Sequence, residues 1–256
     1  MGITFGDLFS IAMGNKIAPY PFQIHLAEES WPDIVKIPTG MGKTAGIILG
    51  WLYKRLQGDR HTPRRLVYCL PMRVLVEQTA DNAHTWVDNL VNANVISENE
   101  RPAISVLMGG EIDKDWDRYP ERQAILIGTQ DQLLSRALNR GYTMSRFRWP
   151  IHFGLLNNDC IWVMDEVQLM GAGLTTTTQI QAFRDSLGTV YPVHSIWMSA
   201  TFEKNWLNTV DFASTSENLS EHSLSAADTK NKAVSKLLGA KKTLQKAKVP
   251  ADNEKK

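Results

Sequence analysis

The chain is 256 residues long, with 43% hydrophobic and 21% charged residues and a formal net charge of +1 at pH 7. This length and composition are those of an ordinary soluble globular protein that can bury a core. Because the net charge is close to zero, the chain as a whole has no attraction to nucleic acid, and any site for a polyanion must be local.

The sequence carries no signal for secretion or membrane insertion. Its two cysteines, Cys69 and Cys160, stand inside apolar runs, which favours buried reduced thiols, and no CxxC pair supports a zinc or redox site. The first ten residues lack the basic start and apolar run of a secretory signal. No apolar stretch reaches the roughly 18 residues that cross a bilayer. We therefore expect a cytoplasmic protein with no membrane partner.

Short apolar runs alternate with helical segments along most of the chain. Strands are expected at 33–37, 65–70, 103–108, 124–128, 160–164 and 194–198, and helices at 43–57, 74–92 and 130–139. This alternation predicts an α/β fold, a mostly parallel sheet with helices on both faces. In such sheets ligands bind at the carboxyl ends of the strands, so residues that follow a strand are the candidates for function.

The composition changes after about residue 212. From Ser214 onward no convincing strand is visible, and residues 229–248 hold seven lysines and no acid. A Lys-rich stretch of this kind is more typical of a solvated helix or linker than of a nucleic-acid arm. We therefore expect an N-terminal lead-in at 1–18, one α/β domain at 19–212 and a Lys-rich linker at 213–256.

A glycine-rich loop follows the expected strand 33–37 and leads directly into a helix. Glycines let backbone N–H groups approach phosphate oxygens, and the helix N-terminus adds a positive dipole end. Position 37 is Ile, so the leading glycine of the pattern GxxxxGK[ST] is missing, and a plain turn is the alternative. The order of strand, loop and helix favours an ATP site, whose loop residues are Pro38, Thr39, Gly40, Met41, Gly42, Lys43 and Thr44.

Two roles in the loop follow from the chemistry of a triphosphate. Lys43 is expected to contact the β- and γ-phosphates, and the hydroxyl of Thr44 is expected to bind Mg²⁺. About 120 residues later, the strand 160–164 ends in Asp165 and Glu166. A pair of carboxylates at a strand end suits Mg²⁺ and water, with Asp165 on the ion and Glu166 polarising the attacking water. Alone, such a pair more often caps the next segment.

The motifs between these two sites identify a family resemblance. PTGMGKT is similar to motif I of superfamily two helicases, DEVQ (165–168) to their DExD/H box, and SAT (199–201) to their SAT motif. PYPFQ (19–23) resembles the Q motif, LPMRVLVEQ (70–78) motif Ia, and IGTQDQLL (127–134) the next nucleic-acid motif. The resemblance extends over residues 19–201 and implies a RecA-like P-loop NTPase lobe.

The resemblance assigns further roles residue by residue. Gln23 would bind the adenine edge, with Tyr20 or Phe22 stacking on the ring. Gln168 stands where the box usually has His or Asp, and it would still hydrogen-bond toward the SAT motif although it cannot ionise. The coupling residues are Gln168, Ser199, Ala200 and Thr201, and the residues expected to contact nucleic acid without reading bases are Arg73, Gly109, Gly110, Thr129 and Gln130.

The residues of three segments are most similar to the CRISPR-associated helicase-nuclease of type I systems. These segments are LPMRVLVEQ (70–78), GTQDQLLSRAL (128–138) and DEVQLMGAG (165–173). In that family the motor binds single-stranded DNA displaced by an RNA-guided CRISPR surveillance complex and moves it toward a metal-dependent HD nuclease, in antiviral defence. None of the six histidines here is followed by Asp, and no second RecA lobe is recognisable. The second lobe and the HD nuclease would then be supplied elsewhere, and the isolated chain would hydrolyse ATP weakly or not at all.

Other interpretations stay open at this stage. The chain could be an ATP-binding assembly module without turnover, another superfamily two helicase, or an unrelated phosphate-loop enzyme such as a kinase. A basic and aromatic patch is also visible, and it favours solvated surface or a partner contact over base stacking. Its residues are Arg136, Arg140, Arg146, Phe147, Arg148 and Trp149.

Overall fold

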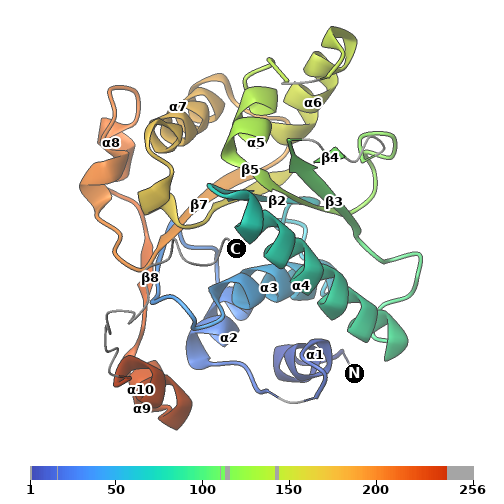
Figure 1. Ribbon diagram of the computed structural model, residues 1–256, viewed down its shortest axis with the longest axis vertical. Helices are drawn as coiled ribbons and strands as arrows, with labels where there is room; N and C mark the ends of the chain where they lie inside the picture. The colour runs from blue at the N-terminus through green and yellow to red at the C-terminus, as the bar shows by residue number, and fades with distance from the viewer. Residues whose placement is uncertain (1, 16, 110, 113–115, 142–143, 241–256) are drawn as a thin grey trace, which may run out of the picture.

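A single sheet of eight strands organises the molecule (Figure 1). The computed structural model describes residues 2–15, 17–109, 111–112, 116–141 and 144–240. The strand order is β4-β3-β5-β2-β6-β7-β1-β8, and every neighbouring pair is parallel except β3 and β4. The strands are β1 Ile34–Lys36, β2 Arg65–Leu70, β3 Ala103–Met108, β4 Glu111–Ile112, β5 Ala124–Thr129, β6 Cys160–Met164, β7 Val193–Ser199 and β8 Glu221–Ser223.

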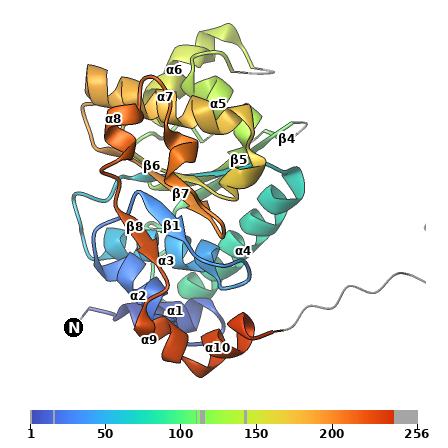
Figure 2. The same ribbon diagram turned by 90° about the vertical axis from the view of Figure 1, so that its left-hand side faces the viewer.

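Helices cover both faces of the sheet, as the edge-on view shows (Figure 2). One face carries α1 Phe5–Ala12, α2 Pro21–Glu28, α3 Lys43–Leu56 and α4 Arg73–Asn92, with α9 Ala226–Lys230 and α10 Lys232–Leu238 below them. The other face carries α5 Gln130–Ala137, α6 Trp149–Leu156, α7 Ala172–Leu187 and α8 Ala213–Ser216. Short 3₁₀ turns occur at η1 Arg146–Arg148, η2 Val167–Leu169 and η3 Lys204–Leu207.

The sheet separates two hydrophobic cores. Every residue of β2, β5 and β6 is buried, because these central strands are covered on both faces. Side chains alternate between the cores: Tyr68 of β2 packs with α3 and α4, whereas its neighbours Val67 and Cys69 pack with the helices of the other face. The predicted fold class, a RecA-like lobe with a mostly parallel sheet between helices, is confirmed.

The ends of the described chain differ from the expectations for 1–18 and 213–256. The segment expected to be a lead-in contains α1, whose Phe5, Leu8 and Phe9 are buried against the core. A strand was not expected after Ser214, yet β8 pairs in parallel with β1 and extends the sheet by one strand. Val234 of α10 is fully buried, so this part of the chain contacts the lobe, although most residues of α9 and α10 are exposed.

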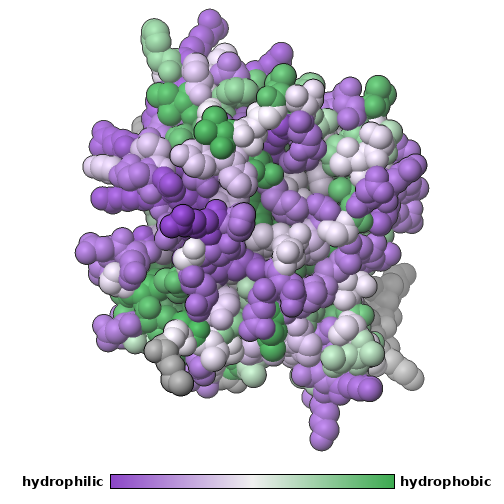
Figure 3. Space-filling model, turned by 180° about the vertical axis from the view of Figure 1, so that it is seen from behind, coloured by the Kyte–Doolittle hydropathy of each residue, from purple (hydrophilic) through white to green (hydrophobic). Residues whose placement is uncertain are grey.

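The surface is mostly hydrophilic on the face seen from behind, where hydrophobic side chains gather in separate small groups (Figure 3). Among the helices of the described residues, none is both long and apolar enough to cross a membrane.

Candidate nucleotide site and nucleic-acid track

The phosphate loop connects β1 to the N-terminus of α3. Gly40 and Gly42 have φ angles of 78° and 76°, a left-handed conformation that glycine adopts without strain. Gly42 is the N-cap of α3, and a Cβ atom there would lie 2.9 Å from Nε2 of Gln23. Gly40, Gly42 and Thr39 are exposed or open to the cavity described below, whereas Met41 points into the core and is 2% exposed. The loop therefore presents its backbone, not its side chains, at the start of α3.

Lys43 is the first residue of α3 and is buried, with 6% of its surface exposed. Its Nζ atom lies 3.5 Å from Oε1 of Glu166 and has no hydrogen-bond partner. A buried ammonium without a hydrogen bond is costly unless a ligand satisfies it. The ion pair with Glu166 offsets part of this cost, and a phosphate oxygen would offset the rest.

Asp165 follows β6 and lies in a closed hydrogen-bonded group with residues of two other elements. Its Oδ2 atom accepts a hydrogen bond from the hydroxyl of Tyr68 at 2.8 Å, and the same hydroxyl is hydrogen-bonded to Oγ1 of Thr44 at 3.2 Å. Burial raises the pKa of Asp165, and the nearby ammonium of Lys43 opposes this shift. A carboxylate that is costly to keep charged in the protein interior suits a divalent cation.

Glu166 and Gln168 connect the acidic pair to the SAT motif. Glu166 has a φ angle of 52°, so the chain turns sharply after Asp165, and η2 begins at the next residue. The Nε2 atom of Gln168 donates to Oε2 of Glu166 at 2.5 Å, and its Oε1 atom accepts from the hydroxyl of Ser199 at 2.7 Å. Gln168 thus bridges β6 and β7 in the way expected of a neutral group.

These residues surround one cavity of about 220 Å³ at the carboxyl edge of the sheet. Its walls come from the phosphate loop, the start of α3, the end of β2, the acidic pair and the first turns of α4. The lining residues are Thr39, Gly40, Gly42, Lys43, Thr44, Leu70, Leu75, Gln78, Thr79, Asn82, Asp165 and Glu166. An ammonium without a hydrogen bond, two carboxylates, a hydroxyl and a glycine loop in one cavity fit Mg²⁺ and a triphosphate.

Gln23 of α2 holds the phosphate loop from the side. Its Nε2 atom donates to the carbonyl oxygen of Gly42 at 2.8 Å, and its Oε1 atom accepts from the backbone N–H of Tyr20 at 2.8 Å. Phe22 was expected as one of two rings that could stack on adenine, but it is 1% exposed and packs in the core. Tyr20 is half-buried and is the ring left for that role.

The remaining predicted site residues are less engaged. Pro38 is half-buried, Ala200 follows β7, and Thr201 is exposed. The backbone N–H of Thr201 donates to Oγ of Ser199 at 3.1 Å, so the motif forms a turn after β7. Within this turn, Gln168 accepts a hydrogen bond from the hydroxyl of Ser199.

The predicted nucleic-acid residues follow neighbouring strands at the same edge of the sheet. Arg73 begins α4 and is exposed, and Gly109 follows β3 directly. Gly110 lies outside the described residues. Thr129 is buried at the end of β5, and Gln130 begins α5 with a buried Oε1 atom that has no hydrogen-bond partner.

Sequence reasoning missed Tyr68 and the α4 wall of the cavity. Tyr68 lies inside the run RLVYCL, where every side chain has the pattern of a buried strand, and nothing in the run distinguishes its hydroxyl. Gln78, Thr79 and Asn82 line the cavity from α4, and the only available signal was that Asn82 lies four residues after Gln78 and three after Thr79.

The family follows from a comparison with protein-family models, in which the DEAD/DEAH box helicase model matches residues 24–209. The chain belongs to the DEAD/DEAH box helicase family. It is therefore an ATP-dependent helicase-type domain of superfamily two, as the motifs predicted. No curated protein matches the chain at the level of sequence.

Solved helicases share the fold at low sequence identity. The DUF1998 helicase MrfA bound to DNA and AMPPNP aligns with a TM-score of 0.61 and 14% identity, over 89% of this chain and 30% of that chain. Mss116p bound to ssRNA and AMP-PNP aligns with 0.55 and 18%, over 87% and 45%. Dbp5 of S. cerevisiae bound to RNA and ADP BeF3 aligns with 0.53 and 15%, over 89% and 51%. The chain thus spans between 30 and 51% of these helicases.

Proposed function

We propose that the chain is the ATP-binding lobe of a motor that hydrolyses ATP to move along single-stranded nucleic acid. The observation that carries the proposal is the buried Lys43 ammonium, which has no hydrogen bond and lies in one cavity with Thr44, Asp165 and Glu166. Family membership and the parallel sheet, which gathers these residues at its carboxyl edge, support it.

The chain's own residues take distinct roles in this proposal. Lys43 binds the β- and γ-phosphates, and its ammonium offsets charge that develops on the transferring phosphoryl group. Thr44 and Asp165 hold Mg²⁺, which supplies charge neutralisation on the phosphates when bound. Glu166 accepts the proton of the attacking water and orients it. Gln168 transmits the state of the Glu166 carboxylate to Ser199 through its two hydrogen bonds.

The substrate strand in this proposal is single-stranded DNA. The motor would belong to a CRISPR-associated helicase-nuclease of type I systems that acts in antiviral defence with an RNA-guided surveillance complex. This assignment is supported by the resemblance of three segments to that family: LPMRVLVEQ (70–78), GTQDQLLSRAL (128–138) and DEVQLMGAG (165–173). A second RecA-like lobe and an HD nuclease act together with this lobe. Another superfamily two helicase is the alternative, and it would not require such a complex.

The test separates the roles of the two carboxylates. Glu166→Gln should keep Mg²⁺-ATP bound and slow its hydrolysis, because the amide cannot accept the proton. Asp165→Asn should weaken the Mg²⁺-dependent part of binding, and Lys43→Ala should abolish ATP binding while the fold survives. Binding is measured by calorimetry, and hydrolysis is measured together with a second lobe.

Three results would count against these roles. Equal loss of binding in both carboxylate variants would contradict the division between ion and water, and unchanged affinity in Lys43→Ala would contradict the phosphate site. ATP binding without turnover that single-stranded DNA stimulates would favour an assembly module.

A further inference from the structure

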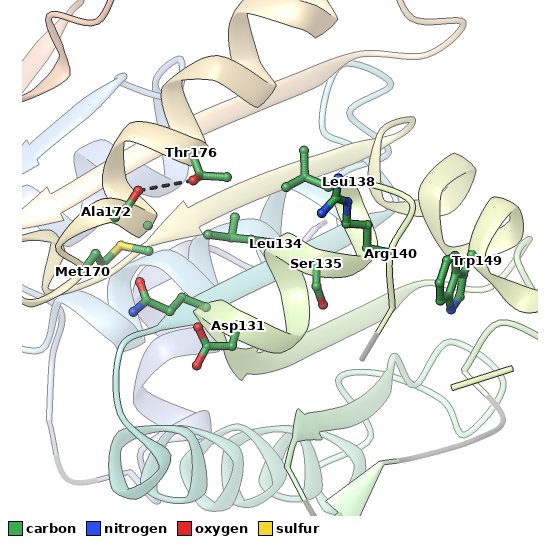
Figure 4. A pocket seen from close by; sticks show the side chains of 11 residues that line it. Asp131, Leu134, Ser135, Leu138, Arg140, Trp149, Met170, Ala172 and Thr176 are labelled. Carbon is green, nitrogen blue, oxygen red and sulfur yellow. Dashed lines mark hydrogen bonds between the residues drawn. The ribbon is translucent and has the colours of Figure 1, made fainter. Parts of the chain in front are cut away.

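A second and larger hollow lies outside the nucleotide cavity, on the α5–α7 face of the sheet. It measures about 860 Å³ and is bounded by α5, by the start of α7 and by the start of α6. Figure 4 shows Met170 and Ala172 at one end and Trp149 at the other, with Ser135 and Arg140 between them. The hollow is therefore a groove along α5 and not a round pocket.

One end of this groove starts at the predicted nucleic-acid track. Gln130 lines the groove, and its buried Oε1 atom lacks a hydrogen-bond partner. The amide of Gln130 lies against Gly173 of α7, where a Cβ atom would come 2.3 Å from Oε1. Neither the fold nor the nucleotide site uses this buried acceptor, and a buried polar atom without a partner calls for a ligand or water.

The other end of the groove carries cationic and aromatic side chains. Trp149 lines the groove with a half-buried ring, and its Nε1 atom is buried without a hydrogen-bond partner. The guanidinium of Arg146 lies 5.9 Å from the Trp149 ring centre. Arg140 lines the groove and is exposed. Phe147, two residues before Trp149 in the sequence, does not line the groove itself and is 92% exposed.

The turn that displays Phe147 is anchored. Arg148, the next residue, donates two hydrogen bonds to the buried carboxylate of Asp117, one of them from Nε at 3.1 Å. His152, one turn along α6, contacts the same carboxylate at 3.0 Å. Arg140, Arg146 and Phe147 are all exposed, and Asp131 is the acidic side chain of the groove.

We propose that this groove is a second binding segment for single-stranded nucleic acid. The strand continues from Gln130 along α5, Arg140 and Arg146 contact its phosphates, and Phe147 and Trp149 provide faces on which bases stack. Exposed rings interleaved with arginines are the chemistry by which proteins hold single strands without regard to sequence. A protein partner would use the exposed Phe147 equally well, but the exposed guanidinium groups of Arg140 and Arg146 favour a polyanion.

The position of α7 gives the groove a link to the nucleotide site. Glu166 is followed by η2, and Ala172 and Gly173 at the start of α7 already line the groove. A shift of the acidic pair would therefore reach the groove wall within a few residues of chain. This inference rests on the proposed function, because it assigns a further segment of the track along which that motor would move.

The experiment uses the intact chain and three variants, of which one changes the groove and one changes the exposed ring of Phe147. Phe147→Ala removes a 92% exposed ring and leaves the core intact, and Arg140→Gln removes one charge. Val210→Ala, which truncates a 96% exposed side chain elsewhere, is the matched control. Binding of fluorescent oligo-dT and oligo-U is measured by anisotropy at several salt concentrations. Photo-crosslinking with iodouracil-containing strands maps the contact.

The expected result has two parts. Phe147→Ala weakens binding roughly 5- to 150-fold, the range for loss of one stacked base. Arg140→Gln lowers the slope of log affinity against log salt by about 0.7, the value for one phosphate contact with a single strand. Crosslinks appear at residues 146–149, and Val210→Ala binds as the unchanged chain does.

Three outcomes would overturn the inference. In the first, Phe147→Ala, Arg140→Gln and Val210→Ala bind the oligonucleotides equally well, and crosslinks are confined to the region of Arg73 and Gly109. This result would show that the groove does not bind the strand, and it would not contradict the proposed function. Loss of a protein partner in Phe147→Ala with unchanged oligonucleotide binding would make the surface a protein-docking site. If neither oligonucleotide bound, even with ATP and a second lobe, the proposed function would be refuted. The proposal of a second binding segment, which rests on that function, would then be refuted as well.

Discussion

The hydroxyl of Tyr68 hydrogen-bonds to both Asp165 and Thr44, the two side chains that would bind one Mg²⁺ ion. The side chains of Asp165 and Thr44 come from β6 and α3, and Tyr68 of β2 hydrogen-bonds to both. Tyr68 is fully buried, and burial beside the carboxylate raises its pKa well above the ordinary value. The hydroxyl therefore stays protonated, and it orients Asp165 before any ligand arrives.

The first prediction concerns this hydroxyl. In Tyr68→Phe the ring still fills the core, but Asp165 loses a hydrogen bond and Thr44 loses a partner. We expect Mg²⁺-dependent nucleotide affinity to fall roughly tenfold, the loss typical of one hydrogen bond to a charged group. Calorimetric titration of nucleotide at several Mg²⁺ concentrations measures the effect, and binding in excess chelator should change little.

The control for this prediction is Tyr53→Phe, which makes the same substitution in a half-buried tyrosine of α3. A uniform loss of affinity with and without Mg²⁺, or an equal loss in the control, would show that Tyr68 supports packing only.

At the scale of single residues, the residues that belong to short sequence motifs could be predicted. Lys43, Thr44, Asp165 and Glu166 follow strands in a fixed order, so their convergence could be inferred from chain order and sheet geometry alone. Tyr68 could not be inferred, because its partners are 24 and 97 residues away and its neighbours in sequence are uniformly apolar. A hydrogen bond between strands leaves no local pattern.

Among the elements, α2 depends on a segment from the far end of the described chain. The backbone N–H of Phe22 in the first turn of α2 donates to Oδ1 of Asp228 at 2.8 Å. Oδ2 of the same carboxylate accepts from the N–H and hydroxyl of Ser225, so Asp228 also forms the capping box of α9. Because α2 also carries Gln23, which bonds to Gly42, α9 supports the phosphate loop through two hydrogen bonds.

The second prediction removes this support. Asp228→Ala leaves a buried N–H of α2 without a partner, and it should lower the free energy of unfolding by about 1–3 kcal/mol. Nucleotide affinity should fall as well, because Gln23 loses its fixed position. Chemical unfolding and calorimetry measure the two effects, with the exposed Asp211→Ala as control. A stable variant with unchanged affinity would contradict the link between α9 and the loop.

The third prediction concerns pH and α6. Burial lowers the pKa of His152 to about 4, although the carboxylate of Asp117 opposes the shift, and the charges of Arg136 and Arg148 add to it. The unfolded chain then binds more protons than the folded chain between pH 6.5 and about 4. This contribution to stability is present above pH 6.5 and is lost as the pH falls toward 4.

Chemical unfolding at several pH values between 4 and 7 checks this expectation against His152→Gln, which cannot titrate. The variant should lose less stability over the window than the unchanged chain does. Parallel curves for the two proteins would show that His152 does not titrate as described.

The short elements were beyond sequence reasoning for a physical reason. β8 has the sequence Glu-His-Ser, with no apolar period, and it forms because β1 offers an open parallel edge. Just before the two strands, the N–H and the hydroxyl of Ser220 both donate to Oδ2 of Asp33. The long buried strands and the helices α3, α4 and α5 were predicted to within a few residues, since periodicity alone specifies them. An edge strand without its own pattern depends on the partner strand.

Across the whole molecule, the carboxyl edge of the sheet gathers both candidate sites. Asp165 follows β6 and Gln130 follows β5, and β2 lies between these strands. Neighbouring strands are about 4.8 Å apart, so the nucleotide cavity and the start of the groove are separated by about 10 Å. A motor needs such proximity, because hydrolysis of the triphosphate must change the affinity of the protein for the nucleic-acid strand.

The fourth prediction concerns hydrolysis by the chain alone. Among the described residues that line the nucleotide cavity, Lys43 is the only cation. In related phosphoryl transfer, an added arginine that stabilises the transition state increases the rate by about 10³–10⁵. We therefore expect these 256 residues to bind ATP weakly, to hydrolyse it barely above background and to unwind no duplex, with or without single-stranded DNA.

Addition of a second RecA-like lobe that carries such arginines should restore DNA-stimulated turnover. Phosphate release from the purified chain, with Lys43→Ala as the blank, is the measurement, and robust DNA-stimulated release from the chain alone would disprove this expectation.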